Sequence, residues 1–97
     1  MRVISKLPLN QFIERVPQAA EPVIKWYLLC KERAWKNFSE LKKDFRTVDA
    51  VGDHLYVFNV GGNKYRIIAR IFFGVETMYI RFIGTHAEYD KVKLSDL

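Results

Sequence analysis

The chain has 97 residues, enough to bury the core of a single domain spanning residues 1–97 and too few for two domains. A content of 49% hydrophobic, 14% aromatic and 28% charged residues excludes a disordered chain, and no apolar run approaches the ~18 residues that a membrane-spanning helix needs. Sixteen Lys and Arg against eleven Asp and Glu give a formal charge of +5, which favours a polyanionic or acidic partner.

The first half of the sequence predicts one short strand followed by helices. Residues 2–6, RVISK, alternate as a short strand, and Pro8 then stands where the first turn of a helix tolerates proline. This helix is expected to end by Pro17. In residues 19–35, side chains recur on one face at spacings of three and four and predict an amphipathic helix: Val23, Trp26, Tyr27 and Cys30. Ser39 is expected to cap a shorter helix, SELKKDF.

From residue 54 the hydrophobic period changes to two, which predicts three consecutive strands. The segments LYVFNV (55–60) and KYRIIARIFF (64–73) are joined by Gly61, Gly62 and Asn63, the residue types that a tight hairpin needs for positive φ. A second turn at residues 74–77 leads into MYIRFIG (78–84). These strands are expected to form an antiparallel meander with the helices packed on one face, so the predicted fold class is α+β.

The middle strand separates an apolar face from a cationic face. Alternate residues from Tyr65 to Phe73 are apolar, apart from one phenol, and are expected to meet the helices. The other face carries three cations: Lys64, Arg66 and Arg70. On the last strand, simple alternation puts Arg81 and Phe82 on opposite faces. Arg66 and Arg81 are therefore expected to share an open surface if the register allows it, and a slip of one residue would separate them.

A capping box is predicted after the last strand, in the tail THAEYDK (85–91). Thr85 and Glu88 have the spacing at which each side chain binds the backbone of the other, so a short helix is expected. His86 at its first position and Tyr89 three residues later then lie on one face. Taken singly, each of these residues is more often structural than catalytic. Two arginines, a histidine and a tyrosine on one edge of a basic domain, however, are typical of a site that binds phosphate.

The remaining candidate residues are expected to be structural. Cys30 lies on the apolar helical stripe and is expected to be a buried small hydrophobe. As the only cysteine, it excludes an intrachain disulfide and indicates a reducing cytoplasm. His54 and His86 do not have the spacing of zinc ligands, and Gly61 and Gly62 belong to a turn rather than a phosphate-binding loop. No metal or other cofactor is predicted.

The segments YVFNVGGNKYRIIARIFF (56–73) and MYIRFIGTHAEYDK (78–91) resemble the HigB toxins of the RelE/ParE superfamily of bacterial toxin–antitoxin modules. With the N-terminal RVISK and the intervening helices, the resemblance covers nearly the whole chain. It implies a RelE-like fold and a ribosome-dependent endoribonuclease, an mRNA interferase that cleaves messages without a metal. It also implies neutralisation by a HigA-type antitoxin with a helix-turn-helix domain, in a hetero-oligomeric complex.

The resemblance further implies roles for individual residues. Nucleases of the superfamily use a basic residue on the central strand, another on the last strand, and a histidine or tyrosine near the C-terminus, which here match Arg66, Arg81, and His86 with Tyr89. Further RNA contacts are expected from three other cations: Lys64, Arg70 and Lys91. Cleavage through the ribose 2′-OH needs a base, an acid and cations at the phosphate. Which of His86 and Tyr89 is the acid and which the base stays open.

Two other functions fit the same sequence. A ParE-like toxin that poisons gyrase would share the fold without nuclease chemistry, and a non-catalytic RNA-binding module would keep the RNA affinity without toxicity. For the antitoxin, the apolar helical residues near Trp35 and Phe38 are the expected docking patch.

Overall fold

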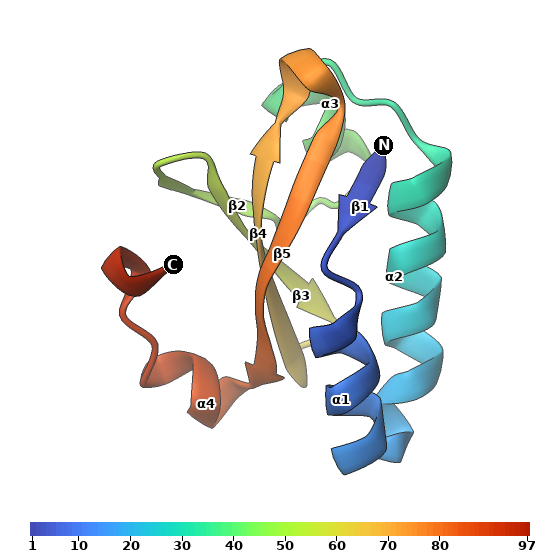
Figure 1. Cartoon of the computed structure of the whole chain (residues 1–97), viewed down its shortest axis with the longest axis vertical. Coiled ribbons are helices and arrows are strands. Elements are labelled where there is room, and N and C mark those ends of the chain that lie inside the picture. The colour runs from blue at the N-terminus through green and yellow to red at the C-terminus, as the bar shows by residue number, and fades with distance from the viewer.

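A five-stranded mixed sheet forms the centre of the computed structural model, which describes residues 1–97 (Figure 1). Its strand order is β1-β5-β4-β3-β2. The strands are β1 (Arg2–Ile4), β2 (Asp49–Gly52), β3 (Leu55–Val60), β4 (Tyr65–Phe72) and β5 (Thr77–Thr85). The predicted antiparallel meander of β3, β4 and β5 is confirmed, whereas the short edge strand β2 was not predicted. The N-terminal strand β1 runs parallel to β5 at the other edge.

The helices begin and end close to where the sequence predicts. They are α1 (Leu7–Arg15), α2 (Ala20–Glu32), α3 (Phe38–Asp44) and α4 (His86–Asp90), with short 3-10 turns η1 (Pro17–Ala19), η2 (Phe73–Val75) and η3 (Leu94–Asp96). The cap of α3 is Asn37, not Ser39 as predicted, because the backbone at Asn37 is extended and its side chain accepts a hydrogen bond of 2.9 Å from the Glu40 N–H. None of these helices combines the length and apolar character needed to span a membrane.

The main core lies between the sheet and the helices α1, α2 and α3. Phe58 is fully buried at its centre, and its ring meets those of Trp26 and Phe45 edge to face, with centroid separations of 5.2 and 5.1 Å. Cys30 is also fully buried here, and burial raises the pKa of its thiol well above the usual range. This confirms the prediction that Cys30 acts as a small apolar residue.

Trp35 belongs to this core and not to a docking surface. Only 3% of the residue is exposed, its Nε1–H donates a hydrogen bond of 2.7 Å to Asp44, and its ring packs against Phe45. Phe38 is half-buried against Tyr56. Trp35 therefore does not face a partner, because its ring and its N–H are both bound inside the chain, whereas the expected docking patch near Phe38 stays a prediction.

The opposite face of the sheet is covered in part by the C-terminal tail. Leu55, Val57 and Ile68 form a second buried cluster on this face. The half-buried residues that pack against it come mostly from the end of the chain: Val51, Phe82, Tyr89, Val92, Leu94 and Leu97. The tail therefore lies across the sheet from α1 and α2 (Figure 1). The prediction of an open surface is wrong for this region. Three apolar strand residues lie here, and other residues must cover them to shield them from water.

The β3–β4 hairpin fixes which residues face each other near its turn. Gly61 and Gly62 both have positive φ, of 65° and 70°, as the predicted tight turn requires. The turn pairs Val60 with Tyr65, and the next pair brings Asn59 opposite Arg66. Lys64 thus lies in the turn, one residue before β4 begins.

A β-bulge in β5 changes the predicted faces of the last strand. Ile68 pairs with Phe82 and Ala69 with Ile80, so Arg81 is an extra residue without a partner in the ladder. Phe82 therefore joins the side of the sheet that carries Ile68, and simple alternation, which separates these two residues, is wrong here. The residue of β5 that faces Arg66 is Gly84.

Candidate active site

Arg66 lies at the centre of the candidate site, on β4 between Asn59 of β3 and Gly84 of β5. The guanidinium carbon is 4.5 Å from the centroid of the Tyr89 ring, which is a cation–π contact across to α4. The Nε atom of Arg66 is buried and has no hydrogen-bond partner. Since buried donors are almost always paired, an unpaired guanidinium nitrogen at this place is suited to an acceptor from outside the chain, such as a phosphate oxygen.

The short helix α4 is fixed in place by the predicted capping box, which is confirmed. The Thr85 hydroxyl accepts from the Glu88 N–H at 3.3 Å, and Glu88 accepts from the Thr85 N–H at 2.9 Å. Glu88 also pairs with Arg15 of α1, with 3.0 Å between Nη2 and Oε2. β1 pairs only with residues 77–79 of β5, so the last part of β5 has no neighbouring strand on that side. The Arg15–Glu88 ion pair joins α1 to α4 across this free edge.

Gly84 lets α4 approach the sheet closely. A Cβ atom at this position would lie 3.0 Å from the Cβ of Glu88 and 2.6 Å from the Phe82 ring. Gly84 is buried, so no space exists for a side chain between β5 and α4. The glycine therefore sets the distance between Arg66, which it faces on the sheet, and the helix that carries His86 and Tyr89.

His86 and Tyr89 occupy the first and fourth positions of α4. The Nε2 atom of His86 is buried and has no hydrogen-bond partner, like the Nε of Arg66. The Tyr89 ring lies against Phe82, with 6.5 Å between centroids, as well as against the Arg66 guanidinium. Of the four predicted catalytic residues, Arg66 and Tyr89 are thus in contact, and His86 lies on the same helix as Tyr89.

Arg81 makes no ion pair and no cation–π contact with this group. It is exposed in the bulge of β5, three residues and roughly 10 Å along the strand from the glycine that faces Arg66. The predicted shared surface of Arg66 and Arg81 depended on simple alternation, and the extra residue of the bulge breaks that alternation. An exposed arginine in this position is suited to a nucleic-acid backbone rather than to the phosphate that Arg66 would hold.

The three other predicted RNA contacts differ in their surroundings. Lys64, in the β3–β4 turn, and Lys91, at the end of α4, are exposed and make no ion pair. Arg70 instead binds Asp53, with Nη2 2.9 Å from Oδ2, and donates a hydrogen bond of 3.0 Å to the Leu97 carbonyl. Its donors hold the C-terminus and the β2–β3 turn, which favours a structural role for Arg70.

Asn59 is a candidate residue that the sequence analysis missed. It pairs with Arg66 across the hairpin, and its Oδ1 is buried without a hydrogen-bond partner. An unpaired acceptor thus stands directly opposite a residue with an unpaired donor. Counting pairs back from the Gly61–Lys64 turn would have identified this neighbour, because the turn sets the register.

The structure groups no set of three His, Cys, Asp or Glu side chains that could hold a metal ion. His54, the second histidine, stacks on Phe72 with 4.8 Å between ring centroids and lies on the turn before β3.

The ionised carboxylate of Glu88 stabilises the folded site in a pH-dependent way. The hydrogen bond from the Thr85 backbone, with the pairing to Arg15, lowers the pKa of the Glu88 carboxyl below its ordinary value of 4.5. The folded state thus favours the carboxylate, so this stabilisation is present above the ordinary pKa and is lost as the pH falls through the lowered one. Because the pair is largely exposed, we expect at most about 1 kcal/mol.

The measurement is the free energy of unfolding of the wild-type chain and of Glu88→Gln from about pH 7 to about pH 3. We expect the two to differ at neutral pH and to converge in acid. A difference that stays constant over this range would contradict the role of the carboxylate.

Comparison with known proteins yields one family and close relatives. A family model described as HigB toxin, the RelE-like toxic component of a toxin–antitoxin system, matches residues 19–92. The mRNA interferase HigB of Escherichia coli strain CFT073 is 33% identical over 94 residues, which covers 95% of this chain and 91% of the relative. The mRNA interferase HigB of Shigella flexneri is 35% identical over 92 residues, which covers 93% of this chain and 88% of the relative.

Proposed function

Because this chain belongs to the HigB family of RelE-like toxins, we propose that it is an endoribonuclease that cleaves mRNA on the translating ribosome and thereby arrests growth. In this proposal residues 1–97 form one toxin domain that acts in the cytoplasm and is held inactive by a HigA-type helix-turn-helix antitoxin. Two relatives are named mRNA interferases, which supports an RNA substrate. The toxin belongs to a type II module, in which both partners are proteins.

The proposal rests on the surroundings of Arg66. Its buried Nε has no partner, its guanidinium lies over Tyr89, and the Nε2 of His86 on the same helix is also unpaired. Cleavage of RNA needs a cation at the phosphate and groups that move protons. This set of side chains contains both, and their unpaired polar atoms support a site that a ligand completes.

In the proposed reaction the ribose 2′-OH attacks the adjacent phosphorus and loses its proton to a base. The bond from phosphorus to the 5′-oxygen breaks, and the leaving oxygen takes a proton from an acid. The products are a 2′,3′-cyclic phosphate and a free 5′-OH. Arg66 stabilises the additional negative charge of the phosphorane, while His86 and Tyr89 share the two proton transfers. No step in this route requires a metal ion.

Exposed cations guide the message to this position. Lys64 in the hairpin turn and Lys91 at the end of α4 are proposed to bind backbone phosphates on either side of Arg66, and Arg81 is proposed to do the same from the bulge. The formal charge of +5 supports this arrangement. We leave Arg70 out of this set, because its guanidinium is already bound to Asp53 and Leu97.

The test is to map the 5′-ends of cellular RNA after a brief pulse of expression. We expect new ends inside coding regions, together with arrest of translation. Intact messages in growth-arrested cells would overturn the proposal, and induction of the DNA-damage response with intact messages would indicate a gyrase poison. RNA binding without growth arrest would indicate a non-catalytic module.

Ribosome dependence has its own test. We expect purified protein to cleave message bound in programmed ribosomes and to leave the same message intact when it is free in solution. The reason is that none of the five cavities of the chain is lined by Arg66, His86 or Tyr89, so the ribosome must hold the RNA in the reactive conformation. Equal cleavage of free and ribosome-bound message would contradict this.

A further inference from the structure

A row of three aromatic rings lies on the same face of the sheet as Arg66, near the other end of the strands. His54, in the turn between β2 and β3, stacks on Phe72 of β4 with 4.8 Å between ring centroids. Phe72 meets Tyr79 of β5 edge to face, with 6.1 Å between centroids. Tyr79 pairs with Arg70, an even number of residues from Arg66 on β4, so both lie on the face that the tail partly covers. We call His54, Phe72 and Tyr79 the aromatic row.

The aromatic row is open to solvent. His54 is exposed, Tyr79 is 37% exposed, and Phe72 is half-buried between them. The tail covers the middle of this face, where it packs on the buried cluster of Leu55, Val57 and Ile68, and no ring of the row belongs to that cluster. Exposed rings beside cations are typical of a surface that binds single-stranded nucleic acid, because unpaired bases stack on such rings.

The backbone at His54 has a conformation that suits glycine better than histidine. Asp53 and His54 both have positive φ, of 53° and 62°, as a two-residue hairpin turn of this kind requires. Contacts from β4 hold the turn in place: Arg70 binds Asp53, and the His54 carbonyl accepts a hydrogen bond of 2.8 Å from the Ile71 N–H. A histidine held at a position that favours glycine lowers stability, which points to a use for its imidazole at the surface.

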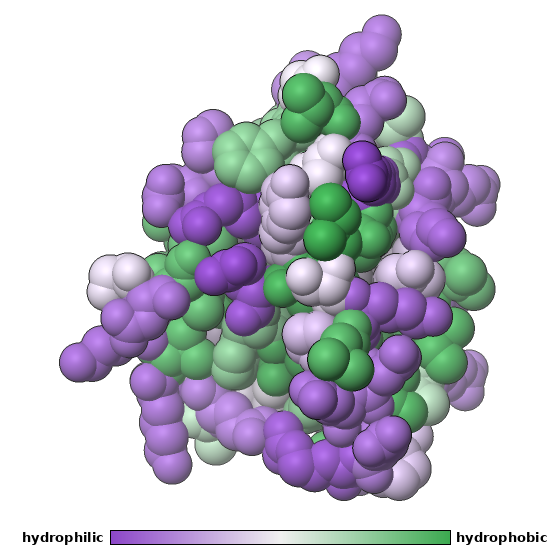
Figure 2. Space-filling view, viewed as in Figure 1, coloured by the Kyte–Doolittle hydropathy of each residue, from purple (hydrophilic) through white to green (hydrophobic).

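The strand β5 connects the aromatic row with the candidate active site. Gly84 faces Arg66, Arg81 is exposed in the bulge, and Tyr79 lies at most roughly 17 Å along the strand from Gly84. Arg81 makes no ion pair, so its guanidinium is available to a phosphate. Figure 2, in the orientation of Figure 1, shows apolar and weakly polar side chains over β1 and β5, with hydrophilic side chains on both sides. An RNA strand that leaves Arg66 along β5 meets a cation first and aromatic rings next.

We propose that the aromatic row is a second RNA subsite, which stacks unpaired bases of the message at a distance from the bond that is cleaved. Arg81 binds a phosphate between the two subsites, and the rings of Tyr79 and His54 take bases beyond it. This inference rests on the proposed function, because it extends the path of the RNA from Arg66. Every base has a π-face, so the row adds affinity without selecting a sequence.

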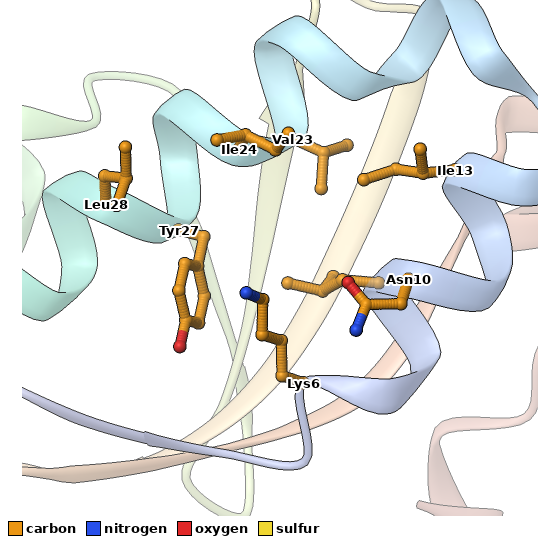
Figure 3. Close-up of a pocket in the computed structure, with 8 residues that line it drawn as sticks. Lys6, Asn10, Ile13, Val23, Ile24, Tyr27 and Leu28 are labelled. Atoms are coloured by element: carbon orange, nitrogen blue, oxygen red, sulfur yellow. The ribbon is translucent and has the colours of Figure 1, made fainter.

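The test measures the affinity of purified full-length variants for a short single-stranded RNA whose 2′-hydroxyls are all methylated, so that it cannot be cleaved. Tyr79→Leu keeps an apolar side chain but removes the ring, and we expect the affinity to fall at least about fivefold. The matched control is Tyr27→Leu on α2, which should bind as the wild type does. Tyr27 is also partly exposed and has a cation beside its ring, since Figure 3 shows Lys6 next to it in a pocket of the helical layer.

Two further variants separate stacking from charge and from folding. Arg81→Gln removes one phosphate contact, so the slope of log affinity against log salt should become shallower by about 0.7, whereas Tyr79→Leu should leave this slope unchanged. His54→Gly suits the positive φ of the turn, so its free energy of unfolding should not fall below that of the wild type. Its affinity for the RNA should nevertheless fall, because the imidazole is lost.

Cleavage on message-programmed ribosomes separates this inference from the proposed function. We expect Tyr79→Leu to need more toxin for half-maximal cleavage and to reach the wild-type rate at saturation, because the row binds RNA but touches no reacting atom. If the wild type does not bind the methylated RNA, or if Tyr79→Leu and His54→Gly both bind it as the wild type does, the subsite is overturned, and cleavage by the wild type then leaves the nuclease function standing.

Two other outcomes are equally decisive. If the row variants lose RNA affinity while the wild type cleaves no message, the subsite stands and the nuclease function fails. If these variants keep the RNA affinity but lose the antitoxin, the row is a protein-docking surface and the proposal is overturned.

Discussion

Replacing Arg66 with lysine is expected to slow mRNA cleavage about 10²–10³-fold, because the guanidinium is a preorganised donor at the charge that develops in the transition state. The planar fork of arginine can bind two phosphate oxygens at once and lies favourably over an aromatic ring, and the Arg66 guanidinium carbon is 4.5 Å from the centroid of the Tyr89 ring. Lysine keeps the net charge but offers only a point charge. The measurement is single-turnover cleavage on message-programmed ribosomes, with RNA binding determined separately.

The matched control for this change is Arg46→Lys. Arg46 is exposed and makes no ion pair, so its replacement should leave the rate unchanged. We expect smaller losses from His86→Gln and Tyr89→Phe, because a neighbouring group can take over part of a proton transfer, and from Arg81→Lys, because Arg81 lies in the bulge. If Arg66→Lys cleaves at the wild-type rate while His86→Gln is inactive, the arginine only positions RNA.

Gly84→Ala is expected to slow mRNA cleavage without changing any of the proposed reacting groups. The added methyl group would lie 3.0 Å from the Cβ of Glu88, which belongs to the helix, and 2.6 Å from the end of the Phe82 ring. The ring can rotate away, but the helix is tied down by its capping box and must shift as a unit. Overpacking of this kind costs about 1–3 kcal/mol. A misplacement of catalytic groups by roughly 1 Å costs about 10²-fold in rate, so a shift of α4 by a few tenths of an ångström is expected to slow cleavage by less than that.

The control for Gly84→Ala is Gly74→Ala. A Cβ at Gly74 meets no atom within 4 Å, and this glycine does not have positive φ, so the substitution should be neutral. Both variants are compared by denaturant unfolding and by single-turnover cleavage. A Gly84→Ala variant with wild-type stability and rate would show that α4 does not need its close contact with the sheet.

Features encoded within a few residues were predicted well from the sequence. The capping box at Thr85 and Glu88 and the hairpin at Gly61 and Gly62 depend on local backbone chemistry, and both are confirmed. The meander and the apolar face of β4 follow from a period of two in consecutive segments and are also confirmed. The neighbourhood of His86 and Tyr89 is likewise a property of one short helix.

Features that depend on distant contacts were missed. The bulge at Arg81 leaves no signal in the alternation of β5, because an extra residue can be detected only when the partner strand is known. Trp35 lies in the loop between α2 and α3, and its burial depends on Asp44 and Phe45 at the far end of α3. The cover over Leu55, Val57 and Ile68 comes from residues at the end of the chain, whose sparse apolar positions do not indicate a packed tail.

The parallel pairing of β1 with β5 determines when the toxin becomes complete during its synthesis. Arg2 emerges from the ribosome first, yet its partner Thr77 is made 75 residues later, and α4 follows β5. The nascent chain thus lacks a closed sheet edge until Thr77 has been made, and it lacks His86 and Tyr89 until later still. We therefore expect the sheet edge at β1 and the candidate site on α4 to form late and together, after α1 and α2 have already left the ribosome.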